Sequence, residues 1–220
     1  MSMGHYAVVL ARRAFELRAP LWRYIAAAEV LDIVRSGTII AGVQWSRFDK
    51  TVPGAPLIMD YTPWTHSYPA AIASGVKVFQ VAGRLFRRAP RAALALSVVT
   101  FSHFPLDYIV HRPDLSLGVG TPKVGLALSS RPALEQFFEI GCLALAAAAW
   151  GCRRGLLRLP AAGALGFLAL RVTLQFLPVT ASLIADPVGF GVLGLVIYFG
   201  LTAVATLIDQ SNKGDNRDAA

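Results

Sequence analysis

The stretch Ser102-His103-Phe104-Pro105-Leu106-Asp107-Tyr108-Ile109-Val110-His111-Arg112-Pro113-Asp114-Leu115 places polar, ionisable side chains at the end of an apolar run. His103, Asp107 and His111 follow one another at i, i+4 and i+8. On a helix they lie on roughly one face, about 6 Å apart along the axis at each step. Imidazole and carboxylate are costly in lipid, so they face a bundle interior and mark a site. The ligand types suit zinc or a similar divalent metal, although a proton relay or a buried hydrogen-bonded cluster gives the same pattern.

The composition is that of a membrane protein. Of the 220 residues, 55% are hydrophobic and 15% are charged, whereas about 25% are charged in an ordinary soluble domain. The formal net charge of +8 could suggest a nucleic-acid partner. The arginines, however, lie in short loops between apolar runs, where they set membrane topology. We therefore expect the lipid bilayer, and no nucleic acid, as the partner of this chain.

The apolar runs predict an all-α, polytopic transmembrane helical bundle. We expect a short N-terminal helix over 3–18 and spans over 21–44, 67–86, 92–111, 132–150, 160–183 and 188–208. Residues 1–208 then form a single transmembrane domain, and the polar tail 209–220 is predicted to be disordered. Long loops are expected at 45–65 and 112–130. Pro105 is predicted to kink the third span.

Clusters of arginine predict the orientation. One short loop carries Arg87, Arg88 and Arg91, and another carries Arg153, Arg154 and Arg158. By the positive-inside rule both loops are cytoplasmic, which places the two long loops outside and the C-terminus inside. Polar residues of four helices then converge in or near the outer half of the bundle. They are Asp32, His66, Asp107, His111, Glu135 and Glu139.

Four motifs follow one another between residues 4 and 117. They are Gly4-His5-Tyr6-Ala7, Ala28-Glu29-Val30-Leu31-Asp32, Tyr61-Thr62-Pro63-Trp64-Thr65-His66-Ser67 and the run from Ser102 to Leu117. Together they resemble the bacterial membrane-bound metal-dependent hydrolase family, which includes the YdjM-like inner-membrane proteins. The resemblance implies a multi-pass protein of the bacterial inner (cytoplasmic) membrane. The order of the ligands is also similar to that of zinc-dependent phospholipase C.

Two positions depart from the family pattern. Gly42-Val43-Gln44-Trp45 stands where a Gly-(Ile/Leu)-Glu-His element is expected, and Ser129-Ser130 stands where many relatives have Trp-Asn. The departure at Gln44-Trp45 implies fewer bound metals or an altered activity.

The predicted function is metal-dependent hydrolysis of a phosphoester or lipid, with zinc as the expected metal. The predicted ligands are His66, His103 and Asp107, followed by His111, Asp32 and His5. Glu135 is predicted to orient or deprotonate the attacking water, or else to form an ion pair at a helix start. Arg171, near the middle of the fifth span, is predicted to bind an anionic substrate group or to pair with a carboxylate.

Two other functions stay open. The cluster could serve a transporter or permease as a proton or metal pathway, or it could be vestigial in a non-catalytic membrane protein. A transporter carries polar groups through the full membrane depth and often shows inverted repeats, so the one-sided polar layer favours an enzyme. For His5 to join the site, residues 3–18 must insert into the bundle instead of lying on its cytoplasmic surface.

Overall fold

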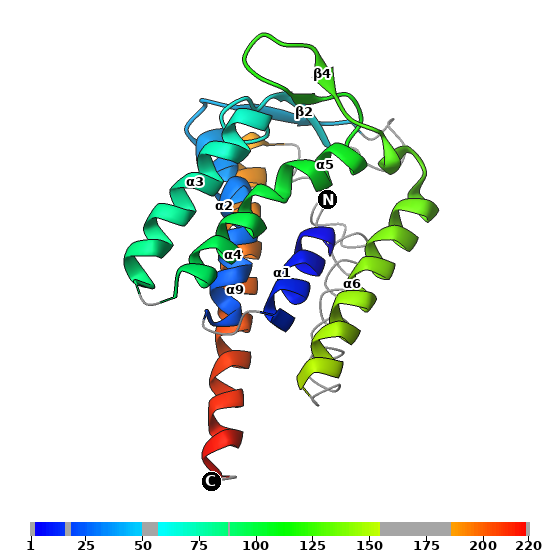
Figure 1. Ribbon diagram of the computed structural model, residues 1–220. Coiled ribbons are helices and arrows are strands. Elements are labelled where there is room, and N and C mark those ends of the chain that lie inside the picture. The colour runs from blue at the N-terminus through cyan, green and yellow to red at the C-terminus, as the bar shows by residue number, and fades with distance from the viewer. Residues whose placement is uncertain (1–2, 16–18, 50–56, 88, 155–185, 219–220) are drawn as a thin grey trace.

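The computed structural model describes residues 3–15, 19–49, 57–87, 89–154 and 186–218. Most of these residues are helical (Figure 1). The helices are α1 (Met3–Phe15), α2 (Leu21–Ile40), α3 (Tyr68–Leu85), α4 (Pro90–Phe101), α5 (His103–Val110), the 3-10 helix η1 (Leu128–Ser130), α6 (Pro132–Arg154) and α9 (Pro187–Asp218). The strands are β1 (Trp45–Phe48), β2 (Leu57–Tyr61), β3 (Leu115–Ser116) and β4 (Lys123–Val124).

Within the described residues, three helical stretches are long and apolar enough to cross a membrane. They are Pro90–Val110, Pro132–Cys152 and Pro187–Leu207. The prediction of a mainly helical chain is confirmed, and the predicted spans 92–111, 132–150 and 188–208 coincide with these stretches. The predicted spans 21–44 and 67–86 are not long and apolar enough to be among them. The predicted fifth span, 160–183, lies outside the described residues, and so does Arg171.

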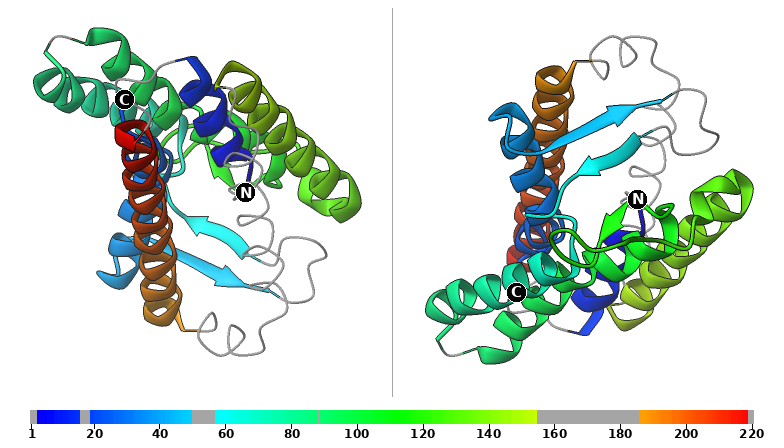
Figure 2. Two further views of the ribbon diagram at one scale, coloured as in Figure 1. Left: turned by 90° about the horizontal axis from the view of Figure 1, so that it is seen from below. Right: turned by 90° about the horizontal axis from the view of Figure 1, so that it is seen from above.

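The helices pack in pairs around α2. α1 lies against α6, α3 against α4, and α2 against both α9 and α4. Figure 1 and Figure 2 show α2 beside the first part of α9, whose C-terminal part continues past α2. Their close approach depends on glycine: a Cβ atom on Gly191 would lie 2.8 Å from the carbonyl oxygen of Ser36, and one on Gly194 would lie 2.6 Å from the Ser36 hydroxyl. Small residues of this kind allow membrane helices to pack closely.

The predicted third span is divided into two helices. α4 ends at Phe101 and α5 begins at His103. Pro105 has no N–H to donate to the carbonyl of Phe101, four residues earlier, which weakens the helix at this point. α5 then ends at Val110, and His111 is its C-cap in an extended conformation. His111 therefore leaves the helical face that His103 and Asp107 share, which corrects the expectation of one continuous helix.

The fold is not purely α-helical. β1 pairs with β2, and β3 with β4, as two short antiparallel hairpins in the segments predicted to be loops. Lys123 holds the hairpins together, because its ammonium group donates hydrogen bonds to the carbonyls of Met59 and Asp60. Both hairpins lie at the end of the molecule where α1 begins (Figure 1). At the opposite end α9 continues to Asp218, into the tail for which the sequence predicts disorder.

Candidate metal centre

Five imidazole and carboxylate side chains from four segments meet inside the protein. α1 supplies His5, α2 supplies Asp32, the turn before α3 supplies His66, and α5 supplies His103 and Asp107. None of them is more than 7% exposed. This set is called the His/Asp cluster below.

One group of ligand atoms comes from Asp32, His66 and His103. The Nε2 atom of His66 lies 3.2 Å from Oδ1 of Asp32 and 3.3 Å from Nε2 of His103. The Nε2 atom of His103 lies 3.6 Å from Oδ2 of Asp32. Two ring nitrogens and a carboxylate thus converge on a common point.

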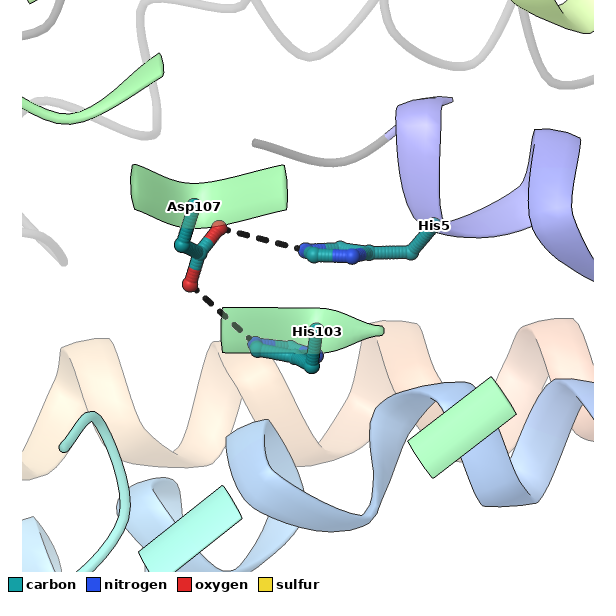
Figure 3. Close-up of side chains that lie close together, drawn as sticks. All are labelled: His5, His103 and Asp107. Carbon is teal, nitrogen blue, oxygen red and sulfur yellow. Dashed lines mark ion pairs between the residues drawn. The ribbon is translucent and has the colours of Figure 1, made fainter. Parts of the chain in front are cut away.

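The second group comes from His5, His103 and Asp107 (Figure 3). The two oxygens of Asp107 face different partners: Oδ1 lies 3.3 Å from Nε2 of His5, and Oδ2 lies 3.3 Å from Nε2 of His103. Oδ2 also lies 3.6 Å from Nε2 of His66. His103 belongs to both groups, and the carboxylate of Asp107 connects them.

These separations fit a metal. Four ligands bound tetrahedrally at about 2.0–2.1 Å stand about 3.3 Å from one another. The separations within the group of Asp32, His66 and His103 are 3.2–3.6 Å, and Oδ2 of Asp107 lies 3.3 Å from His103 and 3.6 Å from His66. The Nδ1 atom of His5 is buried and has no hydrogen-bond partner among the described residues. A buried polar atom without a partner is costly, and a cation would supply one.

A peptide carbonyl orients His103. Its Nδ1 atom lies 2.9 Å from the carbonyl oxygen of Ala28. A carbonyl only accepts, so Nδ1 carries the proton and, in the neutral ring, Nε2 keeps its lone pair toward the cluster. Metal-binding histidines commonly donate their second ring N–H to such a group.

A hydrogen-bonded chain orients His66 in the same way. The side-chain oxygen of Gln44 accepts from the backbone N–H of Trp64 and, at 3.2 Å, from the hydroxyl of Thr65. With its proton committed to Gln44, the Thr65 oxygen accepts from Nδ1 of His66 at 3.0 Å. The lone pair of Nε2 is then directed at Asp32 and His103. Gln44, which departs from the family pattern, therefore has a defined place beside the cluster.

The surroundings keep His66 in its metal-binding form. Burial lowers the pKa of His66 to about 4, aided by the charge of Arg35 and opposed by the hydrogen bond to Asp32. A neutral imidazole is the form that binds metal. Arg35 lies 2.8 Å from Oδ1 of Asp32, which fixes that carboxylate, and a second guanidinium nitrogen contacts the sulfur of Met59.

His111 lies at the edge of the cluster, outside both groups of ligand atoms. Its Nε2 atom is 3.9 Å from Oδ1 of Asp107, and its Nδ1 atom is 3.2 Å from Oδ1 of Asp114. The other oxygen of Asp114 accepts from the backbone N–H of Met59. The position of Asp114 three residues after a histidine was the signal for an aspartate–histidine pair.

Glu135 occupies the first turn of α6 and is buried, as is Glu139 one turn later. Neither belongs to the two groups of ligand atoms. The structure therefore places the predicted ligands His5, Asp32, His66, His103 and Asp107 together, with His111 beside them and Glu135 on a separate helix.

Comparisons of this chain with protein-family models, with curated proteins and with solved structures show no match.

Proposed function

We propose that this chain is a membrane-embedded metal-dependent hydrolase centred on the His/Asp cluster. The observation that carries the proposal is the meeting of three histidines and two aspartates at the spacing of metal ligands. Zinc is the metal that best suits nitrogen and oxygen ligands in a tetrahedral arrangement. The motif resemblance to membrane-bound metal-dependent hydrolases supports the same conclusion.

Some side chains would bind the metal, and others orient those ligands. A bound zinc ion supplies Lewis acidity and lowers the pKa of water toward neutrality. Either Asp32, His66 and His103 or His5, His103 and Asp107 would hold it, and three protein ligands leave the fourth position of a tetrahedral ion for water. Arg35, Thr65 and the Ala28 carbonyl keep three of these ligands in place.

Proton transfer is assigned to His111. Asp114 accepts the Nδ1–H of His111, so in the neutral ring the Nε2 atom retains a lone pair on the side of Asp107. From there it can accept a proton from a water molecule at the cluster and return it to the leaving group. We prefer His111 to Glu135 for this role because only His111 contacts the cluster among the described ion pairs.

A phosphoester at the membrane surface is the proposed substrate class. Large aromatic side chains are exposed near the hairpins, namely Trp45, Trp64 and Tyr68. Tryptophan and tyrosine collect at membrane–water interfaces. His66 follows Trp64 by two residues, so the cluster lies just beneath that interface, at the depth of lipid headgroups. The full proposal is a six-span inner-membrane protein with the hairpins outside and the C-terminus cytoplasmic.

Burial of all five ligands favours one alternative, a structural or vestigial metal site with no catalysis. Purified protein in detergent distinguishes the two. Zinc is measured by mass spectrometry, and hydrolysis is measured with a bis(p-nitrophenyl) phosphate probe and with phospholipid vesicles. We expect bound zinc and zinc-dependent hydrolysis, both lost in His103→Ala and retained in Asp60→Ala, a carboxylate that pairs with Arg47 away from the cluster. Zinc binding without hydrolysis of either substrate supports the structural site, and no zinc binding contradicts the centre itself.

A further inference from the structure

A groove between α2, α3 and α4 forms a second candidate binding site. Its volume is about 380 Å³, which is within the range of ligand-binding pockets. Along α2 it extends from Trp22 to Val30, about 12 Å at the helical rise. Its walls are almost entirely apolar and include Ala26, Val81 and Leu85. No residue of the His/Asp cluster lines it.

The groove opens on a surface suited to hydrocarbon. On α3 and α4, the helices that form two of its walls, large apolar side chains are exposed, among them Ile72, Phe79 and Leu94. An acyl chain is the molecule that meets such a surface in a bilayer. Lipid tails are as apolar as these side chains, so moving a tail into the groove gains little hydrophobic free energy. Selection among lipids must therefore come from a polar contact at the groove.

Arg23 provides that contact. Its guanidinium carbon lies 4.6 Å from the ring centroid of Phe86 and 5.0 Å from that of Trp22. Both aromatic residues line the groove with it. Within the described part of the chain, no carboxylate forms an ion pair with Arg23. Arginine that stacks on aromatic rings keeps its in-plane N–H groups available, and these bind phosphate oxygens in a bidentate manner.

The same end of the groove is positively charged. Phe86 is followed by the exposed Arg87, and Arg84 is exposed one turn earlier. The groove is therefore apolar along its length and positively charged at one end. An anionic lipid has the matching parts, an apolar acyl chain and a negatively charged headgroup. We propose that the groove between α2, α3 and α4 binds one acyl chain of an anionic phospholipid, with the lipid phosphate at Arg23.

The proposed lipid site is separate from the metal centre. Arg23 precedes Asp32 by nine residues on α2, which places them about 13 Å apart along the helix axis. The proposal therefore stands whether or not the protein is a hydrolase.

Native mass spectrometry of the full chain in detergent tests the headgroup contact. The probes are phosphatidylglycerol and phosphatidylcholine with identical dioleoyl chains. Phosphatidylcholine carries the same phosphate but has a fixed positive charge on its choline, which opposes Arg23. We expect wild type to bind phosphatidylglycerol about fivefold more tightly, since one basic residue at an anionic lipid surface contributes about 1 kcal/mol. Arg23→Gln should abolish the preference. Arg91→Gln, which removes an exposed arginine at the same end outside the groove, should leave it unchanged.

A steric pair tests the acyl-chain contact. Ala26→Phe fills the groove and should remove the phosphatidylglycerol adduct, whereas Ala73→Phe, on an exposed position of α3 outside the groove, should not. If Ala26→Phe does not fold, Val81→Phe makes the same test at an exposed groove position. Three results would each overturn the proposal. Wild type binds the two lipids equally, or Arg23→Gln and Arg91→Gln have equal effects, or the phosphatidylglycerol adduct persists when the groove is filled. A protein dimer lost in Ala26→Phe, with no lipid preference, would assign the groove to a second copy.

Discussion

The imidazole rings of His5 and His103 stack face to face, with centroids 3.9 Å apart and planes 8° from parallel. Each directs its Nε2 atom at a different oxygen of Asp107 (Figure 3). Two protonated imidazoles at this distance would repel each other. The stack therefore favours a state in which at least one ring is neutral and a shared cation or proton lies among the ligands.

His103 and His5 should contribute unequally to metal binding. His103 belongs to both groups of ligand atoms and His5 to one. We expect His103→Ala to lose nearly all bound zinc and His5→Ala to lose part of it, as measured by mass spectrometry of purified protein. Asp60→Ala serves as the control for a carboxylate outside the cluster. Full zinc occupancy in His5→Ala would remove α1 from the centre.

The hydroxyl of Thr65 should be needed for tight metal binding. Thr65→Val removes the acceptor for His66 Nδ1, and loss of such an outer partner typically lowers metal affinity about 10–100-fold. Thr65→Ser keeps the hydroxyl and should retain wild-type affinity. Competition with a fluorescent zinc chelator measures both. Equal affinities of the valine and serine variants would show that the hydroxyl does not orient His66.

Gly125 should be intolerant of a side chain. A Cβ atom there would overlap the carbonyl oxygens of His111 and Arg112, and its φ of 157° adds strain. Gly125→Ala should lower stability by about 1 kcal/mol or more and displace His111. On Gly118, by contrast, a Cβ would contact only the methyl group of Thr121, at 3.4 Å. Thermal unfolding in detergent compares the two alanine variants. If Gly118→Ala proves the more destabilising, the packing at the end of α5 is not as described.

The metal-free protein should lose stability in acid. The pKa of His66 falls from 6.5 in the unfolded chain to about 4 in the fold, chiefly through burial. Between those pH values the unfolded state binds more protons than the folded state, so the free energy of unfolding falls as the pH falls. The whole shift in the pKa of His66 corresponds to about 3 kcal/mol. Unfolding of chelator-treated protein from pH 7.5 to 4.5 measures the slope. His66→Gln should flatten it, and an unchanged slope would exclude His66 as a source.

The proposed topology predicts the sides of two loops. Reporter fusions at Arg87 and at Gly118 should report the cytoplasm and the exterior, respectively, because basic loops remain inside. Both fusions on one side would contradict the six-span arrangement.

Much of the cluster was predictable because metal ligands are few and distinctive. Only four histidines occur in the chain, and the interval of four residues from His103 to Asp107 survives in α5 because it spans a single helical turn. His111 shows the limit of this reasoning. The equal interval from Asp107 to His111 does not place His111 on the same helical face, because the helix ends at Val110. The contact with Asp114 instead determines where His111 lies.

The strands and the orienting contacts were not predictable in the same way. β1 and β2 are short, and their pairing depends on contacts with residues distant in sequence, such as Lys123 with Met59. The carbonyl of Ala28 carries no side-chain signal, although it determines which nitrogen of His103 faces the cluster. Gln44 was noticed only as a departure from a motif. Its hydrogen bond to Thr65 gives that departure a physical role.

The pairing of His5 with Asp107 joins positions 102 residues apart in the chain (107 − 5 = 102). An ion held between them would act as a cross-link, closing a loop as long as those closed by natural disulfides. Closing a loop of that length removes about 4–5 kcal/mol of chain entropy from the unfolded state. Chelation should therefore do more than empty a reaction centre. It should release α1 from the helices packed against it, so that the rate of protease cleavage near the N-terminus becomes a direct measure of metal occupancy.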